Sequence, residues 1–196
     1  MKLHLGCGAR NFGEDWIHID GSGRDEGADQ RIPGQFSHIA HYDIERLPFE
    51  ENSCDLLYSS HTIEYFDRDQ IQDLLAEWRR VLKPGGTLRV AVPDFSATCT
   101  LYREGKWVLD NLLGPLYGKR RVNSELTNYH KTVYDQCSLS RVLRDAGFRK
   151  VRKWDWRKVE HGHIDDYSQS YCPHMDKENG VQRVPKPGVH KIIKQV

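Results

Sequence analysis

The sequence has no long hydrophobic run and no strong excess of charge of either sign. No apolar stretch approaches the roughly 20 residues that a membrane-spanning helix needs. The 29 lysines and arginines stand against 28 aspartates and glutamates, which gives a formal net charge of +1. Such a chain has no overall field that would attract nucleic acid or a membrane surface. We therefore expect no membrane partner, and the charge balance disfavours nucleic acid as a substrate.

Cysteines are few and scattered. The chain has five, an odd number, and none forms a CxxC pair with another. This pattern argues against both a disulfide framework and a zinc knuckle, and it favours reduced thiols in a cytoplasmic protein. The first residues also enter a strand pattern at once and leave no room for a signal peptide. Both observations predict a cytoplasmic location.

Hydrophobic residues make up 38% of the 196 residues, enough to build a core without disulfides or metals. The length fits one domain. No internal repeat, low-complexity stretch or interdomain linker interrupts the sequence. We therefore expect residues 1–196 to form a single domain.

Short β-rich runs recur along the chain, and turn-forming or polar residues follow most of them. The expected strands lie at about 2–5, 16–20, 37–42, 55–59, 87–92, 148–154 and 190–196. Helical patterns lie between some of these strands. Strands that alternate with helices predict an α/β fold with a mainly parallel sheet.

The clearest helix is predicted at 71–82, where apolar residues recur at i, i+3, i+4 and i+7 and form one stripe. Asp67 or Asp69 is expected to cap its start, and the Pro-Gly-Gly sequence at 84–86 stops it. A second capped helix is predicted at about 138–145, followed by a glycine at its C-terminal end.

Two segments do not follow this alternation, at about 95–135 and 155–188, and both are rich in aromatic residues, Gly, Pro and polar groups. In α/β sheets, ligands bind over the carboxyl ends of the strands, on loops such as these. We expect the first segment to be a substrate-facing insertion and the second a tail loop. An apolar edge at about 109–116 could support a homodimer.

The turn after the first strand carries the main functional signal. Gly6, Cys7 and Gly8 follow the N-terminal strand, and Asp20 ends the second strand. Glycines at this turn permit positive φ angles and let a ligand approach the backbone. A carboxylate at the end of the second strand can accept hydrogen bonds from both hydroxyls of a ribose. The pattern therefore indicates a nucleoside site, although glycines that only make a tight turn are the simpler alternative.

The same turn disfavours a dinucleotide. A dinucleotide site needs G-x-G-x-x-G at the start of a helix whose N-terminus faces the pyrophosphate. Here Asn11 stands in place of the third glycine, and residues 9–16 have no helical apolar stripe of useful length. S-adenosylmethionine has no phosphate, so its site tolerates this loss. An NAD-type oxidoreductase is therefore the disfavoured alternative.

An ordered set of motifs resembles the class I S-adenosylmethionine-dependent methyltransferases, most of all the small bacterial and phage methyltransferases near the type 11 family. The motifs are LHLGCG, WIHID, YDIERLPF, CDLLYSSHTIEYF, EWRRVLKPGGTLRVAVPDF and LRDAGF. The resemblance is strong over residues 1–95 and weaker over 130–154. It implies a Rossmann-like, mostly parallel sheet of seven strands in the order 3-2-1-4-5-7-6, with an antiparallel last strand and helices on both faces.

The resemblance also implies S-adenosylmethionine as cofactor, with S-adenosylhomocysteine as product. Gly6, Cys7 and Gly8 would pass under its methionine and ribose portions, and Asp20 would hold the ribose hydroxyls. One departure from the family concerns the helix that normally follows the glycine loop. Only 11 residues separate Gly8 from Asp20, so this first helix must be shortened or nearly absent.

Four further residues take cofactor-binding roles from the resemblance. Asp43 and Ile44 would contact the adenine, with the carboxylate accepting from its exocyclic amine. Ser60 and His61 would line the methionine side and the mouth where the methyl group is transferred. The second histidine of the family's H-x-x-E-H segment is Tyr65 here, and no chemical role is assigned to it.

Methyl transfer to oxygen needs a base, and histidine is the natural choice near neutral pH. His130 is the first candidate, because it precedes the second predicted helix at a place where substrate-facing loops are expected. An exposed polar residue without a catalytic role is an equally open interpretation. His163, in the tail segment, is the second candidate.

The tail segment allows another interpretation. Its neighbouring imidazoles and carboxylates, from His161, His163, Asp165 and Asp166, could ligate a divalent metal. Nothing in their spacing fixes a tetrahedral or octahedral set, so no metal is predicted. Aromatic faces beside carboxylates, amides and hydroxyls favour a loop that binds an acceptor rich in hydroxyl groups.

The preferred function is therefore methyl transfer to a small or glycan-like acceptor, at oxygen. Basic residues at 119–121 and along 149–158 raise RNA or DNA as an alternative acceptor. Acidic residues around them and the neutral total indicate a solvated face instead. A partner subunit that binds the cofactor without catalysing transfer is the other alternative.

Overall fold

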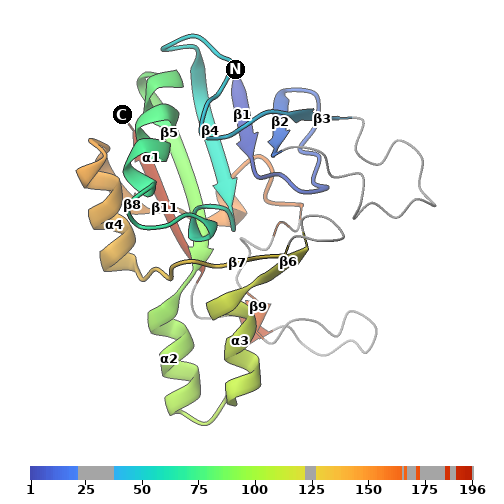
Figure 1. The fold of residues 1–196 in the computed structure, drawn as a ribbon, viewed down its shortest axis with the longest axis vertical. Coiled ribbons are helices and arrows are strands. Elements are labelled where there is room, and N and C mark those ends of the chain that lie inside the picture. The colour runs from blue at the N-terminus through green and yellow to red at the C-terminus, as the bar shows by residue number, and fades with distance from the viewer. Residues whose placement is uncertain are drawn as a thin grey trace, which may run out of the picture.

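The computed structural model is built around a β-sheet (Figure 1). It describes residues 1–21, 38–121, 127–164, 166, 171–172, 184–185 and 189–195. Seven strands from these residues form the main sheet: β1 (Lys2–Leu5), β2 (Trp16–Asp20), β3 (Ile39–His41), β4 (Cys54–Ser60), β5 (Leu82–Pro93), β8 (Arg149–Lys153) and β11 (Val189–Gln195). Their order across the sheet is β3-β2-β1-β4-β5-β11-β8.

The direction of the strands confirms the α/β class and the mostly parallel sheet. The first five strands pair in parallel, and β11 runs antiparallel to both β5 and β8. Because β8 and β11 are the sixth and seventh strands of this sheet along the chain, the order 3-2-1-4-5-7-6 with an antiparallel last strand is confirmed. The carboxyl ends of β1, β2 and β4 therefore lie at one edge of the sheet, where ligands bind in α/β proteins.

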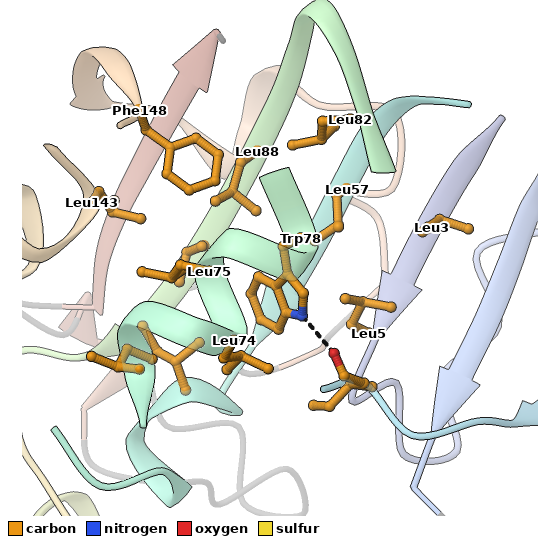
Figure 2. Close-up of a cluster of buried hydrophobic side chains, with 14 of the residues drawn as sticks. Leu3, Leu5, Leu57, Leu74, Leu75, Trp78, Leu82, Leu88, Leu143 and Phe148 are labelled. Carbon is orange, nitrogen blue, oxygen red and sulfur yellow. Dashed lines mark hydrogen bonds between the residues drawn. The ribbon is translucent and has the colours of Figure 1, made fainter. Parts of the chain in front are cut away.

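Two helices, α1 (Ile71–Val81) and α4 (Gln136–Asp145), cover one face of the sheet (Figure 1). Their apolar sides pack on aliphatic residues of the central strands, and Trp78 lies fully buried at the centre of this layer (Figure 2). The indole N–H of Trp78 donates a hydrogen bond of 2.9 Å to the main-chain oxygen of Ile44. The predicted helices are confirmed within two residues at their ends.

The caps of the two helices differ. The N-cap of α1 is Gln70, which makes no side-chain capping bond, so the prediction that Asp67 or Asp69 caps this helix is wrong. The carboxylate of Asp67 pairs instead with the ammonium of Lys131 at 2.9 Å, and only its main-chain oxygen accepts from the helix start. The capped start of α4 is confirmed, because Asp135 Oδ1 accepts a 2.7 Å hydrogen bond from the amide of the third helical residue.

The opposite face of the sheet has a different cover. No helix lies between β1 and β2, so the expected shortening of the first helix is confirmed for residues 6–15. In the described parts of the chain, this loop and the segment around the short 3₁₀ helix η2 (Trp156–Lys158) cover the face where the resemblance predicts a layer of helices. Rings from both segments pack there on Tyr58 of β4. Loops and aromatic rings thus replace a helical layer.

The insertion contains structure that the sequence patterns did not reveal. Two helices, α2 (Phe95–Arg103) and α3 (Leu109–Tyr117), extend beyond the carboxyl end of β5 (Figure 1). A short antiparallel pair, β6 (Lys119–Arg121) and β7 (Thr127–Tyr129), follows them. Another such pair, β9 (Tyr171–Cys172) and β10 (Val184–Pro185), belongs to the tail loop. None of the helices in the described residues is both long and apolar enough to cross a membrane.

Candidate active site

The loop after β1 is tied to the end of β2. The amides of Gly6 and Cys7 both donate to the main-chain oxygen of Ile19, at 2.8 and 3.2 Å. The amide of Gly8 donates a 2.8 Å hydrogen bond to Oδ2 of Asp20, a buried carboxylate at the end of β2. The structure therefore brings together the four residues predicted at the first two strands. Asp20 fixes the shape of the glycine loop in addition to any contact with a ligand.

Gly6 is required by the space around it as well as by its conformation. Its φ angle is +66°, which residues with a side chain rarely adopt. A Cβ at this position would lie 2.2 Å from Oγ1 of Thr62, a buried residue just after β4. The carboxyl ends of β1 and β4 are thus in direct contact at this glycine. Thr62 was not predicted, because no sequence pattern indicates that it packs on the glycine loop.

The segment after β3 places Asp43 and Ile44 differently. Asp43 is exposed, and its Oδ1 accepts a 2.8 Å hydrogen bond from the amide of Glu45. Ile44 packs its side chain into the core, and its main-chain oxygen accepts from Trp78. Asp20 pairs with His41 of β3, so Asp43 follows the strand that lies beside Asp20. A contact of these two residues with adenine remains a prediction.

At the end of β4, Ser60 and the tail segment are in contact. The hydroxyl of Ser60 donates a 3.2 Å hydrogen bond to the main-chain oxygen of Asp166, and Tyr58 donates to the carboxylate of the same residue. His163, which lies three residues before Asp166 in the sequence, has an exposed side chain. Asp165 lies outside the described residues. In the described part of the chain, no group of three or more His, Cys, Asp or Glu side chains is arranged so that it could hold a metal ion.

Two histidines and a glutamate converge just beyond the end of β4. Oε1 of Glu64, in the 3₁₀ helix η1 (Ile63–Tyr65), lies 3.3 Å from Nδ1 of His61 and 3.8 Å from Nε2 of His130. His61 follows β4 directly and has a φ angle of +52°. Such strained conformations concentrate at functional sites. Sequence analysis proposed both histidines but missed Glu64, which joins them.

His130 is held tightly from several sides. Its side chain is 5% exposed, and its Nδ1 lies 3.2 Å from the main-chain oxygen of Pro115 in α3. The ring of Tyr65 packs edge-on against it, with the ring centres 4.7 Å apart. Burial lowers the pKa of His130, and the nearby carboxylate of Glu64 opposes that shift only in part. His130 is therefore neutral near pH 7.

The arrangement fits a nucleoside ligand without phosphate beside an acid–base group. A glycine loop that has no room for a Cβ at Gly6 meets a buried carboxylate at the ends of β1 and β2. Within residues 1–21, no helix starts after the loop to hold a phosphate. His61 follows the end of β4, the strand that pairs with β1 and its glycine loop. The edge formed by the carboxyl ends of β1, β2 and β4 can thus hold a ligand and place a base beside it.

Comparison with known proteins finds similarity to methyltransferases, over the first part of the chain for a family model. Residues 3–90 match the model of the methyltransferase domain of type 11. This stretch runs from β1 into β5 and contains the glycine loop, Asp20 and the segment of His61 and Glu64. The finding confirms the resemblance noted from the sequence motifs.

Several curated relatives are methyltransferases. The demethylmenaquinone methyltransferase of Staphylococcus haemolyticus is 32% identical over 124 residues, which cover 59% of this chain and 49% of the relative. The ubiquinone/menaquinone biosynthesis C-methyltransferase of Paracoccus denitrificans is 32% identical over 126 residues, or 61% and 48% of the two chains. The chain spans about half the length of these relatives.

Solved structures share the fold over nearly the whole chain. An S-adenosylmethionine-dependent methyltransferase from Archaeoglobus fulgidus superimposes with a TM-score of 0.55 at 17% identity, covering 99% of this chain and 85% of that protein. One from Methanosarcina mazei gives a TM-score of 0.54 at 17% identity, with 98% and 90% covered. At this identity the likeness shows the fold, including the strands contributed by residues beyond 90.

Proposed function

We propose that this protein methylates a small acceptor that carries a hydroxyl group. The match of residues 3–90 to the type 11 methyltransferase domain supports its assignment to the class I S-adenosylmethionine-dependent methyltransferases. The main support for the proposal is the glycine loop, whose conformation is fixed by its contacts. Gly8 is bound to Asp20, and Gly6 packs on Thr62 so closely that no side chain fits. This geometry supports a nucleoside site of the kind that the matched family uses.

S-adenosylmethionine supplies an electrophilic methyl group on a sulfonium sulfur. In our proposal Gly6, Cys7 and Gly8 pass beneath its methionine and ribose, and Asp20 binds the ribose hydroxyls. We also propose that Asp43 and Ile44 contact the adenine, and that Ser60 and His61 lie on the methionine side. The protein's main task is to hold the acceptor in line with the methyl group and to exclude water.

The acceptor is proposed to lie between the end of β4 and the α2–α3 hairpin. Aromatic residues of the hairpin and of β7 are exposed there: Phe95, Tyr102, Tyr117 and Tyr129. Aromatic faces beside imidazoles suit a sugar or another hydroxyl-bearing small molecule. His61, His130 and His163 are the candidate bases, and the first two stand at the same end of the sheet. O-methylation of a small or glycan-like acceptor is our first choice.

Methylation at a ring carbon is the second candidate. Two observations favour it: the relatives in quinone biosynthesis, and an exposed apolar surface on α3. Val108, Leu109 and Leu113 are 62%, 60% and 46% exposed, and they could contact an apolar substituent of an aromatic acceptor. The same surface is the apolar edge that could support a homodimer. A cytoplasmic location stays part of the proposal, supported by the free thiols of the described cysteines.

Calorimetric titration with S-adenosylhomocysteine tests the cofactor. We expect micromolar binding of this ligand and none of NAD. Asp20→Asn should weaken binding at least tenfold, because it alters both the loop contact and the ribose partner. Asp55→Asn is the matched control, since this exposed carboxylate pairs with Lys83 at the far end of β4. Preference for NAD, or no binding of either ligand, would contradict the proposal.

The acceptor is tested with S-adenosylmethionine labelled in its methyl group. Candidate acceptors are methyl glycosides, simple phenols and a hydroxylated naphthoquinone, and mass spectrometry with NMR locates the new methyl group. Transfer to oxygen supports the first candidate, and transfer to a ring carbon supports the second. Tight cofactor binding without transfer to any class would favour the partner-subunit alternative. Transfer to RNA alone would overturn both small-molecule candidates.

A further inference from the structure

We infer that His18 is a positioning residue of the cofactor site, whose neutral imidazole holds the loop after β1 in the shape that binds S-adenosylmethionine. The inference rests on the proposed function, because it explains how the same loop is kept in place. It starts from a hydrogen bond that ties this loop to β2 at a second point, beyond the bond between Gly8 and Asp20.

The second bond is short and joins the main chain to a buried ring. The amide of Phe12 donates to Nε2 of His18 over 2.7 Å. His18 lies in β2 and is 2% exposed, so this bond is kept away from bulk water. No helix forms in residues 6–15, and the loop therefore has no helical hydrogen bonds to fix its far end. The contact with His18 supplies that anchor.

The bond defines the tautomer of His18. A main-chain amide can only donate, so Nε2 of His18 must carry a lone pair and the proton of the neutral ring must lie on Nδ1. A second imidazole shows the opposite arrangement. Nε2 of His38 lies 3.3 Å from the main-chain oxygen of Arg10, which can only accept, so this nitrogen must carry a proton. Full protonation of the rings therefore breaks the bond to His18 and leaves the bond to His38 intact.

The anchor at Phe12 acts on the glycine loop through a short turn. The amide of Arg10 donates to the main-chain oxygen of Cys7 at 3.1 Å, so residues 7–10 are closed on themselves. Phe12 follows directly after this turn, and its ring stacks on His4 with the ring centres 4.0 Å apart. Loss of the bond at Phe12 would therefore free one end of the segment that is proposed to pass beneath the cofactor.

Several titratable groups lie around His18 in the described structure. The rings of His4 in β1 and of His38 before β3 have their centres 5.6 and 5.2 Å from that of His18. Asp20 follows on the same face of β2, and its carboxylate binds the glycine loop. Burial is the main cause that lowers the pKa of His4, and the charge of Arg10 in the loop adds to this shift. Apart from Asp20, these groups disfavour a positive charge on His18.

The contact makes closure of the loop depend on pH. Burial and the neighbouring His38 lower the pKa of His18 to about 4 in the closed loop. An imidazole released into water has a pKa of about 6.5. The closed loop is therefore fully favoured above about pH 6.5 and loses this advantage as the pH falls toward 4. At pH 5.5 the equilibrium between closed and open loop shifts by about tenfold, which limits the loss of cofactor affinity.

The first test measures the ring and the amide without ligand. NMR of the histidine ring nitrogens in the full chain at pH 7.5 should show His18 protonated at Nδ1 only, and the signal lost in His18→Gln assigns this ring. Exchange of the Phe12 amide with deuterium should be similar in the unmodified protein and in His18→Gln, whose side-chain oxygen can accept in place of Nε2. It should be at least about tenfold faster in His18→Leu, which has no acceptor. A proton on Nε2, or equal exchange in the two variants, would overturn the inference.

The second test is calorimetry with S-adenosylhomocysteine at pH 7.5 and pH 5.5. The affinity of the unmodified protein should weaken several-fold at the lower pH. His18→Gln should bind within about threefold of the unmodified protein at pH 7.5 and should lose most of the pH dependence, because its amide takes up no proton. His38→Gln is the matched control, since its side-chain NH₂ can still donate to Arg10, and it should keep the pH dependence. An equal pH dependence in the unmodified protein and in His18→Gln would contradict the inference.

The two tests separate this inference from the proposed function. If S-adenosylhomocysteine does not bind to the unmodified protein at pH 7.5, the proposed function fails, and the role of His18 in a cofactor site fails with it. If the ligand binds equally well to the unmodified protein and to His18→Leu, only the role of His18 fails. A merely structural role would lower the free energy of unfolding without changing the pH profile of binding. If His18→Leu does not fold, the tautomer and the pH profile of His18→Gln decide.

Discussion

The two faces of the central sheet are built from different chemistry. The face beneath α1 and α4 is aliphatic, with Leu57 and Leu75 packed around the fully buried ring of Trp78 (Figure 2). The opposite face carries imidazole, phenol and indole rings on the same strands, among them His4 and Tyr58. Alternate residues of one strand point to opposite faces, so β1 and β4 contribute to both layers.

The second face is held together by stacked rings. Phe12, from the loop that replaces the first helix, stacks on His4 with the ring centres 4.0 Å apart and on His161 at 4.3 Å. Neither ring nitrogen of His161 has a hydrogen-bond partner in the described structure. Flat rings let two loops cover a sheet without a helix, but they bury imidazoles that must stay neutral. This ring-lined cover should therefore be the acid-sensitive half of the protein.

Acid destabilisation is the largest effect we expect, and it should arise on the second face. Burial lowers the pKa of His18 and of His161 to about 4 and that of His4 well below its usual value, although Asp166 and Glu160 oppose the shift at His161. As pH falls from about 6.5 toward 4, the unfolded chain binds protons that the folded chain does not. The free energy of unfolding should therefore fall, by about 2 kcal/mol for each of His18 and His161 at pH 4.5.

Urea unfolding at pH 7.5 and pH 4.5 measures this loss. His161→Phe is the matched variant, because a phenyl ring can keep the stack on Phe12 and takes up no proton. At pH 4.5 the His161→Phe variant should recover part of the free energy of unfolding that the unmodified protein loses. If unfolding is equally difficult at both pH values, the buried imidazoles are not the acid-sensitive groups.

Replacement of a buried tryptophan should lower the free energy of unfolding more on the face covered by α1 and α4 than on the opposite face. Trp78→Ala is expected to lower the free energy of unfolding by about 3–5 kcal/mol, because the ring is fully buried and the oxygen of Ile44 loses its donor. Trp154→Ala is the matched change on the second face, where the ring is slightly exposed and its bond to Val90 is longer, at 3.3 Å. We expect about 2–3 kcal/mol for it. Chemical denaturation of both variants checks the order, and the reverse order would contradict it.

Loss of the central ring of the stack should have a smaller effect. Phe12→Leu keeps an apolar side chain of similar size but removes both stacking contacts, and Phe12 is only half-buried. We expect a loss of about 1–2 kcal/mol. Phe49→Leu is the control, since this half-buried ring packs against the aliphatic core. Thermal unfolding should show the larger decrease for Phe12→Leu, and equal decreases would argue against a special role of the stack.

The contact between Tyr58 and the tail should give the smallest effect. Tyr58→Phe removes the hydroxyl that donates to the carboxylate of Asp166, which should lower the free energy of unfolding by about 1 kcal/mol. Ser60→Ala removes only the weaker 3.2 Å bond to the main-chain oxygen of the same residue and should cost less. Urea unfolding compares the two variants. A larger effect of Ser60→Ala would show that the side chain of Asp166 does not anchor the tail.

Most of the sheet could be predicted because its signals are local. The bounds of β1 and β2 agree with the prediction residue for residue, since each short run ends at a glycine turn. The helices α2 and α3 were missed because they are short and bury few residues, such as Leu101 and Leu112, and because α3 contains Pro115. Their exposure follows from their position beyond the sheet, where nothing packs on most of their surface in the described structure (Figure 1).

The sequence by itself determined the strand pattern, the glycine loop with Asp20 and the absence of a phosphate-binding helix, because periodicity and turn chemistry act between near neighbours. Only the tertiary structure decided which side chains meet at the end of β4. Glu64 joins His61 to His130 across segments that are distant along the chain. Such a contact depends on where the α2–α3 insertion returns to the sheet, and no local pattern encodes that position. The cover of the second face was decided in the same way, by loops that fold back over strands far from them in the sequence.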